Sequence, residues 1–398
     1  MRKKITVGSD YSGVGAFDYA MKRISAEKEF EVENKFSCDF DYYARVAYLA
    51  NHGISNDLEL AQSPQHKKYA DGVKKIVLSP DEPTKEQEAF LKEANEFCKQ
   101  FSFYYPFNVY DREIPTESVD IYMTSPPCQS FSAAGHRKGK DDENGRGILF
   151  FNSLEFIKIN KPRFFEFENV EGLLSHDKTN PKAEIGNTFQ EWINHLGGKS
   201  VNGVPILFPH ENAVPYHLYW RVLNSKEHGL PHNRKRVFLV GIRDDKDNKF
   251  QYPKEEFLEK RLKNITESIV DAKYCLSEKI ILGFTKHNIH HKKKGTGFIF
   301  APKSGNDIAN CLRANAAINA TDNTLKIDDL QTISNKKPNV QYSIRRLTPL
   351  ECFRLQDFPD SHVENAKAAK VSDSQLYKQA GNSITVRPLE KIINNLPL

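Results

Sequence analysis

The stretch ITVGSDYSGVGAF, residues 5–17, decides the class of fold. A β-rich run over residues 3–9 ends at a turn that holds Gly13 and Gly15. After the turn, apolar residues recur at the spacing of one helix face, at Phe17, Ala20, Met21 and Ile24. We therefore predict a strand, a tight glycine turn and a helix, in that order.

The alternation of strands and helices continues well beyond this stretch. Apolar and aromatic runs predict further strands over residues 32–38, 119–124, 163–167, 217–223 and 236–242. Between them, helical periodicity is clearest over residues 147–160 and 187–196, and Gly197 closes the second of these helices. Such alternation is typical of an α/β fold with a parallel, doubly wound, Rossmann-like sheet, which is the fold we expect.

A polar insertion interrupts this alternation. Residues 52–105 are rich in Lys and Glu, with a helical pattern over residues 86–101. We predict one or two helices there. The sequence does not reveal what the insertion does.

A second, smaller domain is predicted after the last of these strands. Residues 244–341 are irregular and locally basic, with His and Lys residues gathered at 287–294 and a strand-like run at 295–301. A charged run of this kind is most often a solvated face. We therefore predict a first domain at 1–243 and a second domain that begins at residue 244.

Composition sets limits on partners and compartment. The 398 residues include 57 Lys and Arg against 52 Asp and Glu, and the net charge of +5 permits a nucleic-acid partner without requiring one. The six cysteines form no CxxC pair and no zinc-ligand spacing, so we expect neither disulfides nor structural zinc. No apolar run approaches the roughly 18 residues of a membrane-spanning helix, and no secretory leader opens the sequence. We therefore expect a cytoplasmic protein with no membrane partner.

The glycine turn points to a cofactor that contains adenosine. Glycine lets the backbone approach a ligand closely, and Asp39, just beyond the predicted strand at 32–38, stands where a carboxylate binds ribose hydroxyls. Only two glycines are present, and Ala16 follows them, which disfavours NAD and FAD and leaves S-adenosylmethionine open. Because such turns also occur for purely structural reasons, the turn alone does not decide.

The loop SPPCQSFS, residues 125–132, carries Cys128 directly after a predicted strand. A thiol at the carboxyl edge of a parallel sheet lies where doubly wound folds place their sites, and it could act as a nucleophile. A lone cysteine is more often a small buried hydrophobe. The glycine-rich basic segment at 135–147 favours the functional interpretation, because such a loop suits closure over phosphates.

Two further motifs bring charged groups to the sheet. In FEFENV, residues 165–170, Glu168 ends an apolar strand, and we expect its apolar neighbours to favour the protonated form of a candidate acid. A capping or loop-bracing carboxylate is the alternative. In NRKRVFLVG, residues 233–241, strand alternation predicts that Arg234 and Arg236 share one face, for which an exposed salt-bridge ladder is the alternative.

These motifs, followed by RRLTPLECFRLQDFP at 345–359 and QAGNS at 379–383, make the chain resemble the cytosine-C5 DNA methyltransferase family of bacterial or phage type. The resemblance implies a Rossmann-like methyltransferase sheet, a target recognition domain at 244–344, and a segment at 345–398 that completes the catalytic domain. It also implies DNA (cytosine-5-)-methyltransferase activity, of the kind found in restriction-modification systems. Departures from the family pattern, at Tyr11, Ala16 and His232, remove no catalytic group.

The resemblance also implies a set of residues that bind S-adenosylmethionine. In the family this set comprises the glycine turn, the acidic residue after the second strand with an aromatic that stacks on adenine, and later polar and apolar contacts. Here these are Tyr11, Gly13, Gly15, Asp39, Phe40, Asp111, Leu149, Asn382 and Ser383.

The implied chemistry acts on a cytosine flipped out of the duplex. Cys128 would add to C6 and Glu168 would protonate or hydrogen-bond N3, while Arg236 would hold O2 and orient Glu168. The Pro127 backbone would contact the exocyclic amine, and Arg234 would brace the site or a phosphate. The sequence does not identify the base that removes the C5 proton, and no metal is needed.

The implied partner is double-stranded DNA. Gln129, Ser132 and Arg137 lie in the loop that would close on it, and the resemblance makes Lys292, Lys293 and Lys294 candidates for phosphate contacts. We expect a monomer. The recognition sequence, and whether a cognate restriction endonuclease acts separately, stay open.

Two alternatives remain at this stage. A branch of the family methylates a tRNA cytosine, and both its Pro-Pro-Cys-Gln loop and a short element like Phe284-Thr285-Lys286 are similar to this chain. The segment from Leu347-Thr348-Pro349 to Phe358-Pro359-Asp360 looks instead like the bacterial DNA enzymes. A catalytically inactive nucleic-acid-binding homologue is the second alternative, but such proteins typically lose the Cys or the Glu, and both are present here.

Overall fold

The structure is a computed structural model, which describes residues 2–79, 81–109, 119–126, 149–180, 182–243, 250–295, 299–315, 317–327 and 331–398. Contacts between residues divide the chain into two compact units. The first comprises Met1–Leu223, Lys235–Lys254 and Pro388–Leu398, and the second comprises Asn224–Arg234 and Glu255–Arg387. Within the described ranges, no helix combines the length and the apolar character that crossing a membrane requires.

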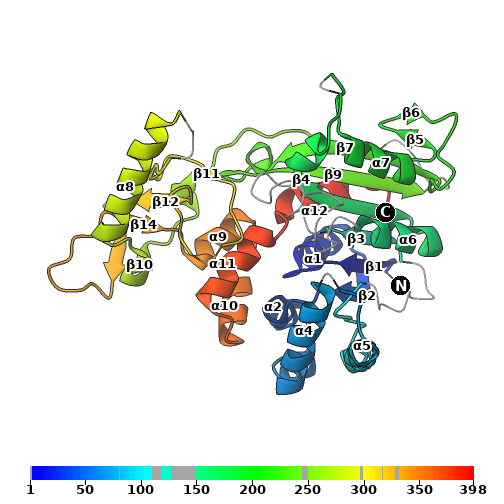
Figure 1. Ribbon diagram of the computed structural model, residues 1–398, viewed down its shortest axis with the longest axis horizontal. Coiled ribbons are helices and arrows are strands. Elements are labelled where there is room, and N and C mark those ends of the chain that lie inside the picture. Colours follow the sequence, from blue (N-terminus) through cyan, green and yellow to red (C-terminus); the bar gives the residue numbers. More distant parts are fainter. Residues whose placement is uncertain are drawn as a thin grey trace. The chain divides into compact units, whose positions relative to one another are not determined.

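An eight-stranded sheet forms the core of the first unit, with the strand order β2-β1-β3-β4-β9-β7-β5-β6 (Figure 1). Its strands are β1 (Lys4–Asp10), β2 (Glu31–Cys38), β3 (Ile121–Thr124), β4 (Phe164–Val170), β5 (Ser200–Val201), β6 (Val204–Pro205), β7 (Tyr216–Asn224) and β9 (Lys235–Arg243). The strands predicted for this part of the chain are present, and the α/β class is confirmed.

The sheet is mixed rather than wholly parallel. β1 pairs with β2 and with β3, and β3 pairs with β4, all in parallel, whereas β4 and β9 pair antiparallel. The expectation of an all-parallel sheet is therefore wrong at β9. β9 follows its neighbour β7 after a short connection, residues 225–234. A parallel pair needs a crossover of about a dozen residues or more, so this connection is too short for β9 to run parallel to β7.

Aromatic packing fixes one face of the sheet against α6 (Leu149–Asn160) and α7 (Asn187–Leu196). Phe150 of α6 stacks on Trp192 of α7, with 4.2 Å between ring centroids, and both belong to a buried cluster with Phe165 and Phe167 of β4. The bounds of α7 match the predicted helix, and Gly197 follows it as predicted. Because side chains alternate along a strand, Glu166 and Glu168 of β4 point to the opposite face.

Two helices from distant parts of the sequence lie side by side in the first unit. They are α1 (Ala16–Lys28) and α12 (Val386–Asn394). An ion pair joins Arg23 to Glu390 at 3.1 Å, and the Lys28 ammonium donates to the Asn394 carbonyl at 2.7 Å. The end of the chain therefore packs beside the first helix.

The insertion folds as helices beside α2 (Tyr42–His52): α3 (Ser55–Ala61), α4 (Pro64–Val77) and α5 (Lys85–Cys98), where the sequence predicted one or two (Figure 1). Ser63 caps α4, since its hydroxyl accepts from the His66 amide, and Pro64 occupies the first turn. Thr84 and Gln87 form a capping box at the start of α5. Tyr69 packs on Phe97 across α4 and α5, at 5.2 Å between ring centroids. Although the composition of the insertion is polar, α4 and α5 pack on each other through apolar faces.

The second unit is assembled from short strands and helices: β8 (His232–Asn233), β10 (Ile269–Asp271), α8 (Glu278–Lys293), β11 (Ala309–Asn310), β12 (Thr324–Lys326), β13 (Thr332–Ser334), β14 (Ile344–Arg346), α9 (Pro349–Leu355), α10 (Asp360–Ala368) and α11 (Asp373–Asn382). The strands pair as β10 with β13, β11 with β8, and β12 with β14. The strand-like run predicted at 295–301 is wrong for its described residues, 295 and 299–301, which form no strand.

The boundary of the second unit differs from the predicted one. Residues 345–387 belong to this unit, and only Pro388–Leu398 return to the first. The buried Arg345 guanidinium donates to both carboxylate oxygens of Glu351 in α9, each at 2.7 Å. Glu351 also accepts from the Thr348 amide. A fully buried, doubly hydrogen-bonded ion pair is costly to separate, so α9 stays with the strand that supplies Arg345.

Candidate active site

A left-handed glycine turn connects β1 to α1. Gly13 and Gly15 have φ values of +54° and +83°, which L-residues with a side chain rarely adopt. A Cβ on Gly15 would also lie 2.3 Å from Nε2 of His52. The turn is therefore closed to larger residues, and it brings backbone N–H groups to the N-terminus of α1, where anionic and polar ligand groups are favoured.

Asp39 joins this turn to the end of β2. Its carboxylate accepts from the amide of Gly13 at 2.9 Å and from the amide of Asp41 at 2.8 Å, and the Ser12 amide donates to the Cys38 carbonyl at 2.9 Å. Burial raises the pKa of the Asp39 carboxyl to about 6, and the negative charge of Asp41 adds to the rise. The two backbone amides and the Arg45 guanidinium oppose it. The structure thus brings together the predicted residues Gly13, Gly15 and Asp39.

An apolar cluster lies at the same carboxyl edge. Cys38, Val109 and Leu149 are buried together, and Tyr11 packs against them. Asn152 of α6 donates to the Val109 carbonyl at 3.1 Å and so fixes this wall. Tyr11 and Leu149, which are distant in sequence and are both predicted cofactor contacts, therefore lie in one cluster.

These residues fit an adenosine-containing cofactor. The carboxylate of Asp39 keeps acceptor capacity beyond its two amide donors, which suits ribose hydroxyls. The glycine turn gives close backbone approach, and the apolar cluster offers a wall for a purine. Phe40, half-buried, has the Lys74 ammonium 5.7 Å from its ring centroid. Asp111, the remaining predicted contact in this part of the chain, lies outside the described residues.

Glu168 is held at the carboxyl end of β4 by two polar partners. The Arg236 guanidinium of β9 lies 3.0 Å from one carboxylate oxygen, and the two side chains are 14% and 7% exposed. The Ser125 hydroxyl donates to the other oxygen at 2.8 Å. Asn169 also donates to the Pro126 carbonyl at 3.2 Å. The predicted contact between Arg236 and Glu168 is present, and the loop that leads to Cys128 begins against this carboxylate.

The apolar environment expected for Glu168 belongs instead to Glu166. Glu166 is 1% exposed, and within the described part of the chain neither of its carboxylate oxygens has a hydrogen-bond partner. Burial, and then the negative charge of Glu168, raise the pKa of Glu166 well above its usual value, which favours its protonated form. Sequence reasoning missed both Glu166 and Ser125 as neighbours of the candidate acid. The alternation Phe-Glu-Phe-Glu was the signal available for Glu166.

The prediction that Arg234 and Arg236 share one strand face is wrong. Arg234 lies in the break between β8 and β9, is 2% exposed, and belongs to the second unit. Its guanidinium donates to the carbonyl oxygens of Gly381, Ser383 and Leu312. Because its guanidinium binds these carbonyls, Arg234 is buried and does not extend the strand pattern of Arg236. It connects separate segments of the second unit.

Several predicted residues lie outside the described part of the chain. They are the candidate nucleophile Cys128, its neighbour Pro127, and the loop residues Gln129, Ser132 and Arg137. Asn382 and Ser383 are described with the second unit, at the end of α11, where the Ser383 carbonyl accepts from Arg234 and Gln356.

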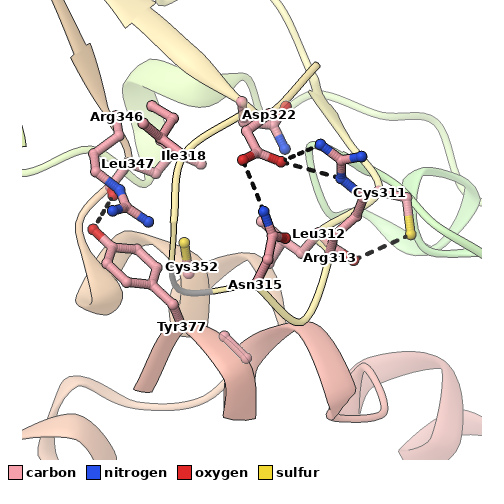
Figure 2. A pocket seen from close by; sticks show the side chains of 12 residues that line it. Cys311, Leu312, Arg313, Asn315, Ile318, Asp322, Arg346, Leu347, Cys352 and Tyr377 are labelled. Carbon is pink, nitrogen blue, oxygen red and sulfur yellow. Dashed lines mark hydrogen bonds and ion pairs between the residues drawn. The ribbon is translucent and has the colours of Figure 1, made fainter. Parts of the chain in front are cut away.

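The second unit carries basic and polar side chains on its surface. Lys292, Lys293 and Lys294 are exposed at the C-terminal end of α8. Figure 2 shows a pocket elsewhere in this unit, in which Arg313 and Asn315 both point at Asp322, with Asn315 donating at 3.1 Å and Arg313 at 2.6 Å. The Arg346 guanidinium lies 3.6 Å from the ring centroid of Tyr377 on the opposite side.

Comparisons with known proteins agree with this geometry. The family model for C-5 cytosine-specific DNA methylase matches residues 107–397. The type II methyltransferase M.HpaII of Haemophilus parainfluenzae is 31% identical, over 98% of this chain and 88% of that protein. The orphan methyltransferase M.SPRI of Bacillus phage SPR is 28% identical, over 99% of this chain and 97% of that protein.

A solved structure shares the fold. The methyltransferase EhMeth of Entamoeba histolytica superposes with a TM-score of 0.61 at 18% identity, over 99% of this chain and 98% of the other. The match to the family model covers most of the chain, and the similarity to M.HpaII spans nearly all of it. The chain belongs to the C-5 cytosine-specific DNA methylase family.

Proposed function

We propose that this protein transfers a methyl group from S-adenosylmethionine to C5 of a cytosine flipped out of double-stranded DNA. The observation that carries the proposal is the placement of Glu168. Arg236 and Ser125 hold its carboxylate at the edge of the sheet where the Cys128 loop begins. The same sheet presents the glycine turn and Asp39 at the carboxyl ends of β1 and β2.

The chemistry follows from the electronics of cytosine. C5 is a poor nucleophile until a thiolate adds to C6, and Cys128 takes that role. As the sulfur–carbon bond forms, electrons move toward N3, where Glu168 donates a proton. Arg236 holds Glu168 in place and offers a donor to O2, while Arg234 secures the loops of the second unit.

The reaction then needs a methyl donor and a return of the thiol. S-adenosylmethionine, when bound, would supply an electrophilic methyl group to C5 and would depart as the neutral thioether S-adenosylhomocysteine. A base then removes the C5 proton, the C6–sulfur bond breaks so that Cys128 leaves as a thiolate, and the N3 proton returns to Glu168. Asp39 holds the ribose, Tyr11 and Leu149 bound the purine, and the backbone at Gly13 allows close approach.

Cofactor affinity should depend on the charge of Asp39. A charged acceptor makes stronger hydrogen bonds than a neutral one, so we expect affinity for S-adenosylhomocysteine to fall about tenfold as the pH decreases through about 6. Asp39→Asn should weaken binding at pH 7.5 by a similar factor and lose this pH step. Isothermal titration calorimetry between pH 5 and pH 8 measures both.

Asp41→Asn is the matched control for this experiment. It keeps an N-cap acceptor for α2, but removes a negative charge that raises the pKa of Asp39. The pH step should therefore persist and move to a lower pH. A step that stays in Asp39→Asn would assign the titration to another group.

The second unit is proposed to read the target sequence, with the lysines at the end of α8 contacting phosphates. Replacing Lys292, Lys293 and Lys294 by Ala should weaken binding to all duplexes alike and reduce the slope of log affinity against log salt by roughly 1–3, because each lost phosphate contact releases about one counterion fewer. Fluorescence anisotropy with specific and scrambled duplexes measures this. The control replaces the exposed lysines of the insertion, Lys85, Lys92 and Lys99, and should leave the slope unchanged. A loss confined to the specific duplex would instead assign base reading to the α8 lysines.

Sequencing of nucleic acid from an expressing host tests the whole proposal. Bisulfite or nanopore sequencing should find 5-methylcytosine in one short DNA sequence, absent from a host that carries Cys128→Ser. Methylation confined to tRNA would replace DNA by RNA as the substrate. The absence of methylation from both, with DNA binding retained, would identify an inactive homologue.

A further inference from the structure

Arg45 is a buried arginine behind the glycine turn, and all of its donors are used. It lies on α2 and is 0% exposed. A guanidinium has five N–H donors. Their acceptors are Nε2 of His66 at 2.8 Å, the carbonyl oxygens of Asp39 at 2.9 Å, Tyr105 at 2.8 Å and Pro106 at 3.0 Å, and the sulfur of Cys98 at 3.7 Å. The side chain is therefore fixed in one orientation.

These bonds connect the two backbone segments that border the candidate cofactor pocket. Asp39 follows β2 and holds the glycine turn. Residues 104–106 run beside β2, where the Ser37 amide donates to the Tyr104 carbonyl at 3.1 Å, and they lead to Val109 of the apolar cluster. A single planar group thus sets the spacing between both segments.

The insertion supplies the outer half of this arrangement. His66 lies on α4, and its Nδ1 bonds the Ala61 carbonyl at 2.7 Å, which leaves Nε2 as the acceptor for Arg45. Burial, and then the Arg45 charge, lower the pKa of His66 to about 2, so it remains a neutral acceptor. The rings of Tyr105 and Phe107 lie 3.9 Å and 4.0 Å from the guanidinium carbon.

No carboxylate is among the five acceptors, so the positive charge of Arg45 acts on its surroundings. The charge of Arg45 lowers the pKa of the Asp39 carboxyl, whereas burial raises it. Asp41 at the start of α2 acts in the opposite direction, and Lys74 of α4 pairs with Asp41 at 2.6 Å. Tyr105 is a further titratable side chain that interacts with Asp39.

We propose that Arg45 is the positioning residue of the cofactor pocket, and that the insertion at 52–105 serves this pocket by holding the Arg45 guanidinium through His66. The inference rests on the proposed function, in that the pocket is taken to bind S-adenosylmethionine. It assigns the insertion to cofactor binding and not to DNA recognition.

Variants of His66 test the proposal with Arg45 left in place. His66→Leu removes the acceptor and leaves the buried Nε–H of Arg45 unpaired, so S-adenosylhomocysteine binding should weaken about tenfold. Affinity for the duplex should stay within about twofold. His66→Gln restores an acceptor and should recover most of the affinity. Phe97→Leu is the matched control, since Phe97 stacks on His66 but its side chain offers Arg45 no hydrogen-bond acceptor. It should leave cofactor affinity within about twofold.

Variants of Arg45 add a second measurement, the pH of the affinity step, which a loss of packing alone would not change. Arg45→Lys keeps the charge but cannot span both segments, so affinity should fall while the pH step stays near 6. Arg45→Gln removes the charge, so the step should move to a higher pH. Thermal melts followed by circular dichroism establish that each variant is folded at the assay temperature. If His66→Leu does not fold, Arg45→Lys decides the proposal by the same affinity measurement.

The outcomes separate this inference from the proposed function. If the wild-type protein binds no S-adenosylhomocysteine, the proposed function is wrong. If the wild type binds it and His66→Leu and Arg45→Lys bind it equally well, only the inference is overturned. Equal losses in His66→Leu and Phe97→Leu, or a loss of duplex affinity alone, would also overturn it.

Discussion

Cys128→Ser is expected to abolish methyl transfer while leaving cofactor affinity within a few-fold of the wild type. In the proposed mechanism the thiolate adds to C6 of cytosine, and a serine hydroxyl is a far weaker nucleophile at neutral pH. The residues proposed to bind the cofactor, by contrast, lie on the glycine turn, at Asp39 and in the apolar cluster around Leu149. Transfer of a radiolabelled methyl group measures activity, and calorimetry with S-adenosylhomocysteine measures affinity.

A mechanism-based trap provides the control for this variant. A duplex with 5-fluorocytosine at the target should give the wild type a denaturation-stable adduct, because fluorine at C5 cannot leave as a proton does. Cys128→Ser should form no adduct. Turnover within tenfold of the wild type, or failure of the active enzyme to be trapped, would refute the covalent route.

Glu168→Gln should slow methyl transfer by about 10²–10⁴-fold, the usual contribution of a general acid or base. The amide keeps the size of the side chain and can still accept from Arg236, but it cannot donate a proton to N3. Single-turnover rates at saturating DNA and cofactor isolate the chemical step from binding.

Glu166→Gln is the matched control on the same strand. Glu166 faces the same side of β4, burial raises the pKa of its carboxyl, and neither carboxylate oxygen has a hydrogen-bond partner among the described residues. An amide should therefore substitute for its carboxyl, with a rate within a few-fold of the wild type. Equal effects of the two substitutions would mean that Glu168 acts through the packing of β4 and not as an acid.

Local signals along the chain were sufficient for most of the individual elements. Residue types alone predict the glycine turn at 13–15, the strand before it and the helix after it. They do so because only a few backbone conformations suit these residue types. The helix Asn187–Leu196 was predictable to the residue because an apolar face and a closing glycine mark it. The contact between Glu168 and Arg236 was predictable only through the family resemblance.

The surroundings of the candidate acid show where local reasoning stops. In the sequence, both Glu166 and Glu168 have apolar neighbours. The polar partners that distinguish the two carboxyls come from other parts of the sheet. Arg236 arrives from β9 and Ser125 from the end of β3, and they reach only Glu168. Which of two carboxyls is paired and which is buried alone depends on strand register, which the sequence does not encode locally.

By itself the sequence determined the α/β class, the glycine turn, the order of the motifs and the family, because these depend on periodicity and on residue types at short spacing. Only the tertiary structure decided that β9 runs antiparallel to β4, that Arg234 and Arg236 separate, and that residues 345–387 join the second unit. It alone placed Arg45 between Asp39 and the insertion. The physical reason is that a buried charged group needs hydrogen-bond partners, and the chain supplies them from distant segments. The acceptors of Arg45 lie up to 61 residues away in the sequence, and those of Arg234 up to 149.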